Sequence, residues 1–288
     1  MARIVLWVDG VLDQGQDAIE KALAEIGPTA FMNVVFCGLH VQPDGSLVYN
    51  GTPVAQLWSG LSGALKAFLQ KYETSTITLA IGGPGFESDF INAAGAASAF
   101  GANLASFCAT CSATVVGLDF CGPYTAQYAD ALVATTKAVH AQDAVEFMMA
   151  AADYTQMAWW VEDGGVLSQT TDSDGQMFAA MNLKFFDSGS NLAPGEWLDQ
   201  FGLWMTELVS NTANKIDDGT QFLVAGCNAV AGFTLANFTQ GIDSVASSYP
   251  RAGGGFVYDY SEIQGNVAAW AHVVWTAFNG GPKRPITP

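Results

Sequence analysis

The chain has 288 residues, half of them apolar and only 13% charged, and its formal net charge is −17. This composition supports a large core and argues against disorder. The negative charge disfavours nucleic acid and anionic membrane surfaces as partners, but it leaves neutral ligands such as sugars open. No apolar run approaches the roughly 18 residues of a membrane-spanning helix, so we expect no membrane insertion.

Apolar runs of strand length alternate with helical patterns along the chain, which predicts an α/β fold with parallel strands. A turn at 42–46 precedes a short hairpin arm at 47–49. We expect strands at 4–8, 31–37, 76–81, 114–120, 144–150, 180–186, 221–225 and 255–260. We expect helices at 17–26, 54–71, 87–110, 125–140, 154–160, 196–212 and 266–278, and a broken helix at 233–249.

Eight strands, each followed by a helix, predict a single (β/α)8 TIM barrel. We expect the barrel to span residues 1–280 and residues 281–288 to form a Pro-rich tail. No linker-like segment divides the chain. Side chains that bind a ligand are expected at the C-terminal ends of the strands, where the sites of such barrels lie.

The start of the chain and its cysteines indicate a compartment. Met1 leads almost directly into the apolar run 4–8, which has the length of a strand and not of a signal peptide's apolar region. The chain has five cysteines, and an odd number without a leader favours reduced thiols. We therefore expect a cytoplasmic protein, or an extracellular one if a leader has been removed.

The fourth predicted strand carries the most informative motif, the run from Val115 to Pro123. Side chains alternate along a strand, so its residues fall on two faces. One face carries Val115, Gly117, Asp119 and Cys121, and the other carries Val116, Leu118 and Phe120. The second face is wholly apolar and suits packing against helices. The first face suits the barrel interior, and Asp119 is expected to point into the barrel mouth.

Three segments carry short motifs in a fixed order. Residues 79–83 read Leu-Ala-Ile-Gly-Gly, residues 117–120 read Gly-Leu-Asp-Phe, and residues 253–258 read Gly-Gly-Gly-Phe-Val-Tyr. They resemble strands three, four and eight of glycoside hydrolase family 18, the chitinase family, and residues 181–187 more weakly resemble strand six. The resemblance implies a chitinase-like barrel with a sugar site at its mouth.

The catalytic end of the family's fourth strand is missing. That strand reads D-G-I-D-F-D-I-E, in which the Glu is the general acid and the Asp before it orients the acetamido group. Pro123 stands at the position of the acid and Cys121 at that of the orienting Asp. Proline has no proton to donate, and a register shifted by two residues would put Cys121 at the acid, where a thiol with a pKa of about 8.5 is a poor donor.

The resemblance therefore implies a pseudoenzyme, a lectin-like protein that binds a GlcNAc-type glycan and has no catalytic residue. Tyr258 would floor the sugar site in place of the family's Trp, and Trp159 and Trp160 would offer aromatic faces. Carboxylates that follow the strands would bind sugar hydroxyls. These are Asp9, Asp119, Asp187, Asp259 and Glu262.

Two alternatives remain open. A pair of the same carboxylates at a suitable separation could hydrolyse a glycoside by a retaining or an inverting route. Alternatively, the barrel could be a structural, storage or toxin-like protein with no glycan site. An open or a plugged barrel mouth would distinguish these cases.

We expect no metal and no cofactor. The three histidines, His40, His140 and His272, have no metal-ligand spacing. Cys108 and Cys111 form a C-x-x-C, which is either a redox or metal pair or two small buried side chains on a helix. No phosphate-binding loop or serine-hydrolase elbow is present, and the sequence leaves the oligomeric state open.

Overall fold

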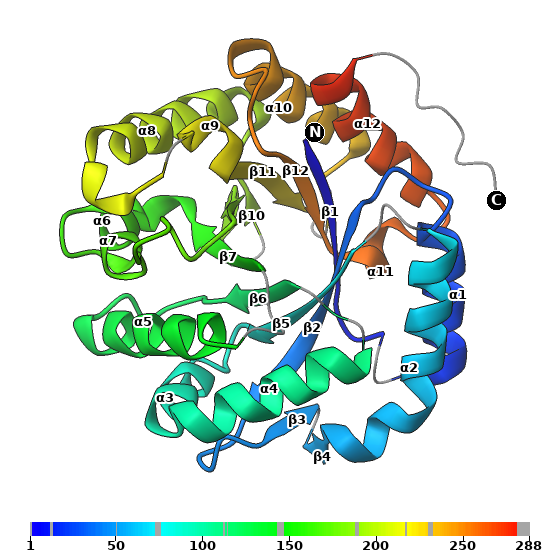
Figure 1. Ribbon diagram of the computed structural model, residues 1–288. Helices are drawn as coiled ribbons and strands as arrows, with labels where there is room; N and C mark the ends of the chain where they lie inside the picture. Colours follow the sequence, from blue (N-terminus) through cyan, green and yellow to red (C-terminus); the bar gives the residue numbers. More distant parts are fainter. Residues whose placement is uncertain are drawn as a thin grey trace.

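The protein is a closed barrel of parallel strands surrounded by helices (Figure 1). The computed structural model describes residues 2–11, 14–49, 51–72, 76–111, 113, 115–142, 147–187, 190–216, 218–229 and 233–280. The expected tail at 281–288 lies outside the described residues. None of the described helices is both long enough and apolar enough to cross a membrane.

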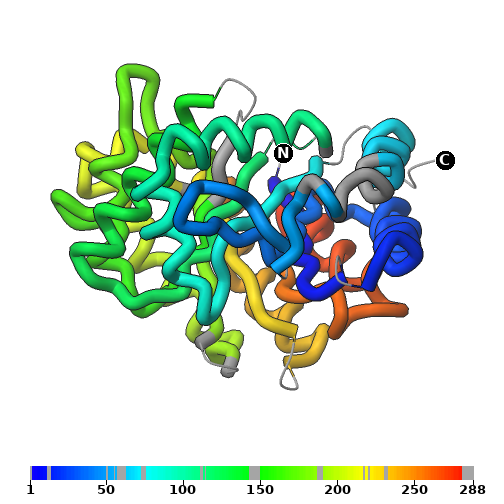
Figure 2. The backbone as a smooth tube through the Cα atoms, turned by 90° about the horizontal axis from the view of Figure 1, so that it is seen from below, coloured from blue at the N-terminus to red at the C-terminus, as the bar shows by residue number. Residues whose placement is uncertain are grey.

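Eight strands form the barrel wall, as the sequence predicts. They are β1 (Arg3–Val8), β2 (Asn33–Val41), β5 (Thr76–Gly82), β6 (Val115–Asp119), β7 (Phe147–Asp153), β8 (Ala180–Lys184), β11 (Leu223–Asn228) and β12 (Gly254–Tyr258). The sheet closes because β1 pairs in parallel with β2 on one side and with β12 on the other. The blue N-terminal and orange C-terminal segments accordingly lie together in Figure 2. The predicted (β/α)8 TIM barrel is confirmed.

Helices cover the outside of this barrel (Figure 1). The longer ones are α1 (Gln16–Ile26), α2 (Val54–Lys71), α3 (Ser88–Gly95), α4 (Ala97–Cys111), α5 (Ala126–His140), α8 (Trp197–Ser210), α10 (Leu235–Ser248) and α12 (Val267–Asn279). Short helical turns are α6 (Met157–Val161), α7 (Val166–Gln169), α9 (Gly219–Phe222) and α11 (Tyr260–Ile263). The hairpin arm is β3 (Leu47–Tyr49), which pairs antiparallel with β2 and with β4 (Thr52–Pro53). A second small hairpin joins β9 (Phe186–Asp187) to β10 (Ser190–Asn191).

Several predicted elements differ from the structure. The second barrel strand extends to Val41, the eighth ends at Tyr258, and the helix expected at 154–160 is a 3-10 turn followed by α6. The fifth barrel strand runs three residues further than expected and ends at Asp153, whose side chain caps the next helical turn. The helix expected at 87–110 is two helices, which part at Ala96. The helix expected to be broken is continuous from Leu235 to Ser248. Gly241 within it allows close packing, since a Cβ there would lie 2.6 Å from the Trp197 ring.

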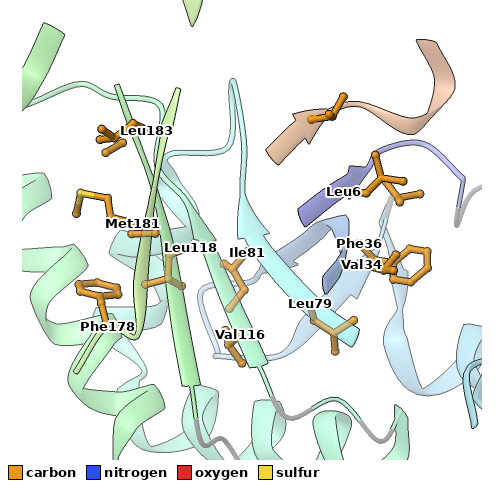
Figure 3. Close-up of a cluster of buried hydrophobic side chains, with 14 of the residues drawn as sticks. Leu6, Val34, Phe36, Leu79, Ile81, Val116, Leu118, Phe178, Met181 and Leu183 are labelled. Atoms are coloured by element: carbon orange, nitrogen blue, oxygen red, sulfur yellow. The ribbon is translucent and has the colours of Figure 1, made fainter. Parts of the chain in front are cut away.

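Hydrophobic side chains form one layer between sheet and helices and another inside the barrel. Leu79, Ile81, Val116 and Leu118 belong to the outer layer (Figure 3). The inner layer contains Val5, Trp7, Val35, Cys37, Ala80, Val115, Ala151, Ala180, Val224 and Phe256. The alternation predicted for the fourth barrel strand is confirmed, since Val115 faces inward whereas Val116, Leu118 and Phe120 face the helices.

Barrel closure depends on a close approach between β1 and β12. Gly254 has a φ of +129°, a conformation that side-chain-bearing residues rarely adopt, and it pairs with Arg3. A Cβ on Gly254 would overlap the Arg3 backbone. The Arg3 guanidinium also donates to the carbonyl oxygens of Ala179 and Gln221, each at 2.9 Å. The N-terminal strand is thus fixed to three neighbouring segments.

We predict that Gly254→Ala destabilises the protein strongly, by about 3 kcal/mol or more, because both the conformation and the space exclude a methyl group. Gly195→Ala is the matched control, since its added Cβ meets no atom within 4 Å. Its effect should stay within about 0.5 kcal/mol. Urea unfolding measures both, and equal stabilities would contradict this account of closure.

Candidate functional site

The C-terminal mouth of the barrel contains a cavity with a volume of about 280 Å³. Strand ends and the loops after them supply its wall. The aromatic part is Trp7, Tyr124, Phe186, Phe256 and Tyr258. The remaining part is Pro84, Glu87, Asp119, Cys121, Ala151, Asp153, Lys184 and Asn228. Aromatic faces with a few polar groups are typical of a small-molecule site.

A buried ion pair lies in the cavity wall. Lys184 Nζ lies 2.8 Å from Asp119 Oδ1, and the two side chains are 11% and 9% exposed. The same amine donates to Cys121 Sγ at 3.1 Å, and the Cys121 thiol faces Asp119 Oδ1 at 3.5 Å. Asp119 therefore points inward, as the strand pattern predicts, and meets a cation from β8, the next strand but one in the sheet.

The pKa values of Lys184 and Cys121 are both raised at this site. Burial alone would lower the pKa of Lys184, but the charges of Asp119 and Cys121 outweigh it, so its pKa is raised. Burial, reinforced by the Asp119 charge, raises the pKa of Cys121 to about 12. Near neutral pH the site thus holds an ammonium beside a neutral thiol.

An aromatic wall stands beside the ion pair. Tyr258 donates from its hydroxyl to Asp9 Oδ2 at 2.8 Å. Its ring stacks on Phe186 with centroids 6.1 Å apart and tilts against Trp7 at 6.4 Å. Burial, and then the nearby Cys37 and Asp9, raise the pKa of Tyr258, so its phenol remains a donor. Asp9 thereby positions Tyr258, although it does not itself line the cavity.

Two hydrogen-bond donors in the cavity wall lack a partner within the described residues. They are Trp7 Nε1 and the Tyr124 hydroxyl, and both atoms are buried. Deeper in the barrel, Thr78 Oγ1 and both amide atoms of Asn182 are in the same condition. Because an unsatisfied buried polar group is costly, Trp7 Nε1 and the Tyr124 hydroxyl are candidate contacts for a ligand oxygen.

Trp159 and Trp160, which we expected to face the ligand, do not line the cavity. Trp160 is fully buried against the core. Trp159 stacks flat on Phe120, with centroids 5.0 Å apart, and donates to the Thr125 carbonyl at 3.2 Å. Because Phe120 faces the helices, this stacking fixes Trp159 on the outside of the barrel wall.

Two more of the expected carboxylates, Asp259 and Glu262, lie away from the cavity wall. Asp259 is buried, and its Oδ1 accepts from both the backbone and the hydroxyl of Ser261 at the start of α11. Burial raises the pKa of Asp259. Glu262 is exposed on α11, and neither residue lines the cavity. The side chain of Asp187, in β9, lies outside the described part of the structure.

Sequence reasoning missed the basic residue of the site. Lys184 ends the sixth barrel strand, and alternation from Asn182 places it inside the barrel. A lysine at the inner end of a strand, in a chain with only ten basic residues, was an available signal. Trp7, Glu87, Tyr124, Asp153 and Asn228 were also missed, because residues from several strands and loops converge only in the closed barrel.

Four thiols are described, and all are free: Cys37, Cys108, Cys121 and Cys227. The side chain of Cys111 lies outside the described residues, so the C-x-x-C stays an open prediction. Among the described side chains, no three potential ligands gather into a metal-binding group. Pro123, at the position of the family's acid, is exposed and does not belong to the cavity wall.

Solved structures share this architecture over nearly the whole chain. A GH18 chitinase from Pseudoalteromonas aurantia has a TM-score of 0.72 at 14% identity and covers 96% of this chain and 100% of its own. The catalytic domain of a GH18 chitinase from the fern Peteris ryukyuensis scores 0.65 at 10% identity, covering 95% and 98%. A GH18 chitinase from Cycas revoluta, in complex with allosamidin, scores 0.67 at 11% identity, covering 96% and 99%.

No protein-family model matches the sequence, and no curated protein sequence matches it either. The structural likeness establishes the fold: the chain has the (β/α)8 barrel of the family 18 chitinases. The expectation drawn from the strand motifs is thereby confirmed for the architecture.

We predict that Lys184→Met lowers the free energy of unfolding by about 3–5 kcal/mol, because it leaves Asp119 buried without its cation. The double variant Lys184→Met with Asp119→Asn should recover most of that loss, since no buried charge remains. Urea unfolding of both single variants and the double variant measures the coupling. A cost below 1 kcal/mol for Lys184→Met would show that the two charges are not desolvated together.

We predict that the folded protein reacts slowly with Ellman's reagent at pH 8, because a Cys121 pKa of about 12 leaves little thiolate. Unfolded protein without reductant should give five thiols, whereas three or one would reveal disulfides.

The raised pKa of Cys121 also makes the free energy of unfolding depend on pH. The contribution of the Cys121 thiol to the free energy of unfolding is complete below the unfolded thiol pKa of about 8.5. It is lost as the pH rises through the pKa of the folded state.

Proposed function

We propose that the protein binds a carbohydrate of the GlcNAc type at the barrel mouth and does not hydrolyse it. The observation that carries this proposal is the cavity at the barrel mouth, which combines aromatic rings with buried donors that have no partner among the described residues. The likeness of the fold to family 18 chitinases supports it. An open cavity also disfavours a purely structural barrel, whose mouth would be filled by side chains.

The wall suits a sugar for two reasons. Rings such as Tyr258 and Phe186 can cover the apolar C–H faces of a sugar, while Trp7 Nε1 and the Tyr124 hydroxyl can donate to its oxygens. The volume of about 280 Å³ is at the lower end for ligand pockets, which commonly span roughly 300–1,000 Å³. We therefore expect a ligand of one or two sugar units inside the cavity.

The same wall disfavours hydrolysis. Asp119, the carboxylate nearest to the degenerate motif, already forms an ion pair with Lys184. Burial raises the pKa of Asp259, but this carboxyl group accepts a hydrogen bond from Ser261 and does not line the cavity. A relocated acid–base pair would need a protonated carboxyl group facing the sugar.

The sugar site is tested by two matched tryptophan variants. Trp7→Phe removes a buried donor from the cavity wall and retains a ring. Trp160→Phe removes a buried donor elsewhere, which also has no partner in the described part of the chain. We predict that Trp7→Phe weakens binding of a GlcNAc disaccharide about 2- to 12-fold, as the loss of one hydrogen bond does. Trp160→Phe should leave the affinity unchanged. Isothermal calorimetry measures both, and equal affinities would place the sugar elsewhere.

Absence of hydrolysis is tested by incubating purified protein with chitin oligomers and measuring released reducing ends. We expect no release above the buffer control, because loss of a general acid commonly removes about 10²- to 10⁴-fold in rate. Release from the wild-type protein that disappears in Glu87→Gln or Asp153→Asn would instead favour a hydrolase with relocated carboxylates. If none of the oligomers binds, the sugar site itself is overturned.

A further inference from the structure

We propose that the cavity prefers a saccharide unit with a free, positively charged amine over the same unit with an N-acetyl group. This inference rests on the proposed function, because it concerns the ligand of the same cavity. The charged groups of the cavity wall decide it: Glu87, Asp119 and Asp153 are acidic, and Lys184 is basic.

The ion pair leaves the wall with a net negative charge. Lys184 lies 2.8 Å from Asp119, so these two charges cancel. Neither Glu87 nor Asp153 forms a salt bridge with any described residue. Two carboxylates therefore face the cavity without a counter-charge, in a protein whose net charge of −17 attracts cations from a distance.

Each of these carboxylates is fixed through one oxygen. Glu87 Oε1 accepts from the Gly85 backbone at 2.9 Å, and Asp153 Oδ1 accepts from the backbone and hydroxyl of Thr155 at 2.8 Å. Within the described chain, no donor bonds to Glu87 Oε2 or Asp153 Oδ2. An ammonium group has three donors and no acceptor, so it complements these oxygens.

The aromatic wall favours the same ligand. Rings such as Trp7, Phe186 and Tyr258 attract a cation placed over their faces. Trp7 is only 2% exposed and its Nε1 lacks a partner within the described residues, which independently indicates that a ligand atom completes the wall. An amino sugar offers both halves of the match, an ammonium for the carboxylates and hydroxyl oxygens for Trp7.

An acetamido group finds less complementarity. Cys121 stands where the family resemblance places the Asp that orients this group, and its sulfur is already in contact with Lys184 Nζ at 3.1 Å. Its neighbour Asp119 is occupied by the same amine. The carboxylate that would hold an N-acetyl group is absent, whereas two that can hold an amine are present.

The test compares a β-1,4-linked glucosamine tetramer with its tetra-N-acetyl counterpart by isothermal calorimetry at low salt. Wild-type protein should bind the amine form about tenfold more tightly, as two partly shielded ion pairs provide. Glu87→Gln with Asp153→Asn should remove this preference, because the two negative charges that the ammonium group would meet are gone. Glu162→Gln, an exposed carboxylate outside the cavity wall, is the control and should keep the preference.

The outcomes separate this inference from the proposed function. Equal wild-type affinities, tighter binding of the N-acetyl form, or a preference that survives the double variant would each overturn the inference, while the sugar site would stand. If folded wild-type protein binds neither tetramer, the proposed function and the inference both fail. Melting temperatures of the variants establish that a lost preference does not reflect unfolding.

Discussion

Closure of the sheet is the constraint on which the rest of this structure depends. Strand β1 pairs with both β2 and β12, so the first and the last strands of the barrel complete one wall. Gly254 permits this contact, since its positive φ and missing side chain let β12 lie against the Arg3 backbone. Only a closed wall directs the inner side chains of all eight strands into one interior, where they form both a core and a site.

The interior changes from apolar to charged along the barrel axis. Small and branched residues such as Val115, Ala80 and Val224 fill its lower part. At the mouth, Lys184 and Asp119 form an ion pair across neighbouring parts of the wall, and Cys121 contacts the same amine. Because a buried charge is tolerated only with a partner, the lysine and the aspartate require each other. Because these two charges cancel, the net charge of the cavity wall comes from its other carboxylates, Glu87 and Asp153.

The site therefore differs in character from the chemistry that the fold suggests. Family 18 chitinases share the architecture, but Cys121 and Pro123 stand where the resemblance places an orienting Asp and a general acid. What the cavity has in their place is an ion pair, an aromatic wall and two carboxylates that form no salt bridge with any residue the structure describes. The proposed recognition of a sugar rests on this set of groups.

The sequence by itself determined the barrel, its eight strands and the inward direction of Asp119. These follow from local patterns, since alternation within a strand and helical periodicity depend on neighbouring residues. Only the tertiary structure decided which side chains meet Asp119. Lys184 is 65 positions away in the chain, and Trp7 and Tyr258 come from opposite ends of it. Trp159 and Trp160 have the right residue type, but the packing of α6 against Phe120 and the core turns them away from the cavity. Contacts between residues so far apart in the sequence arise only when the sheet closes, so local sequence patterns do not predict them.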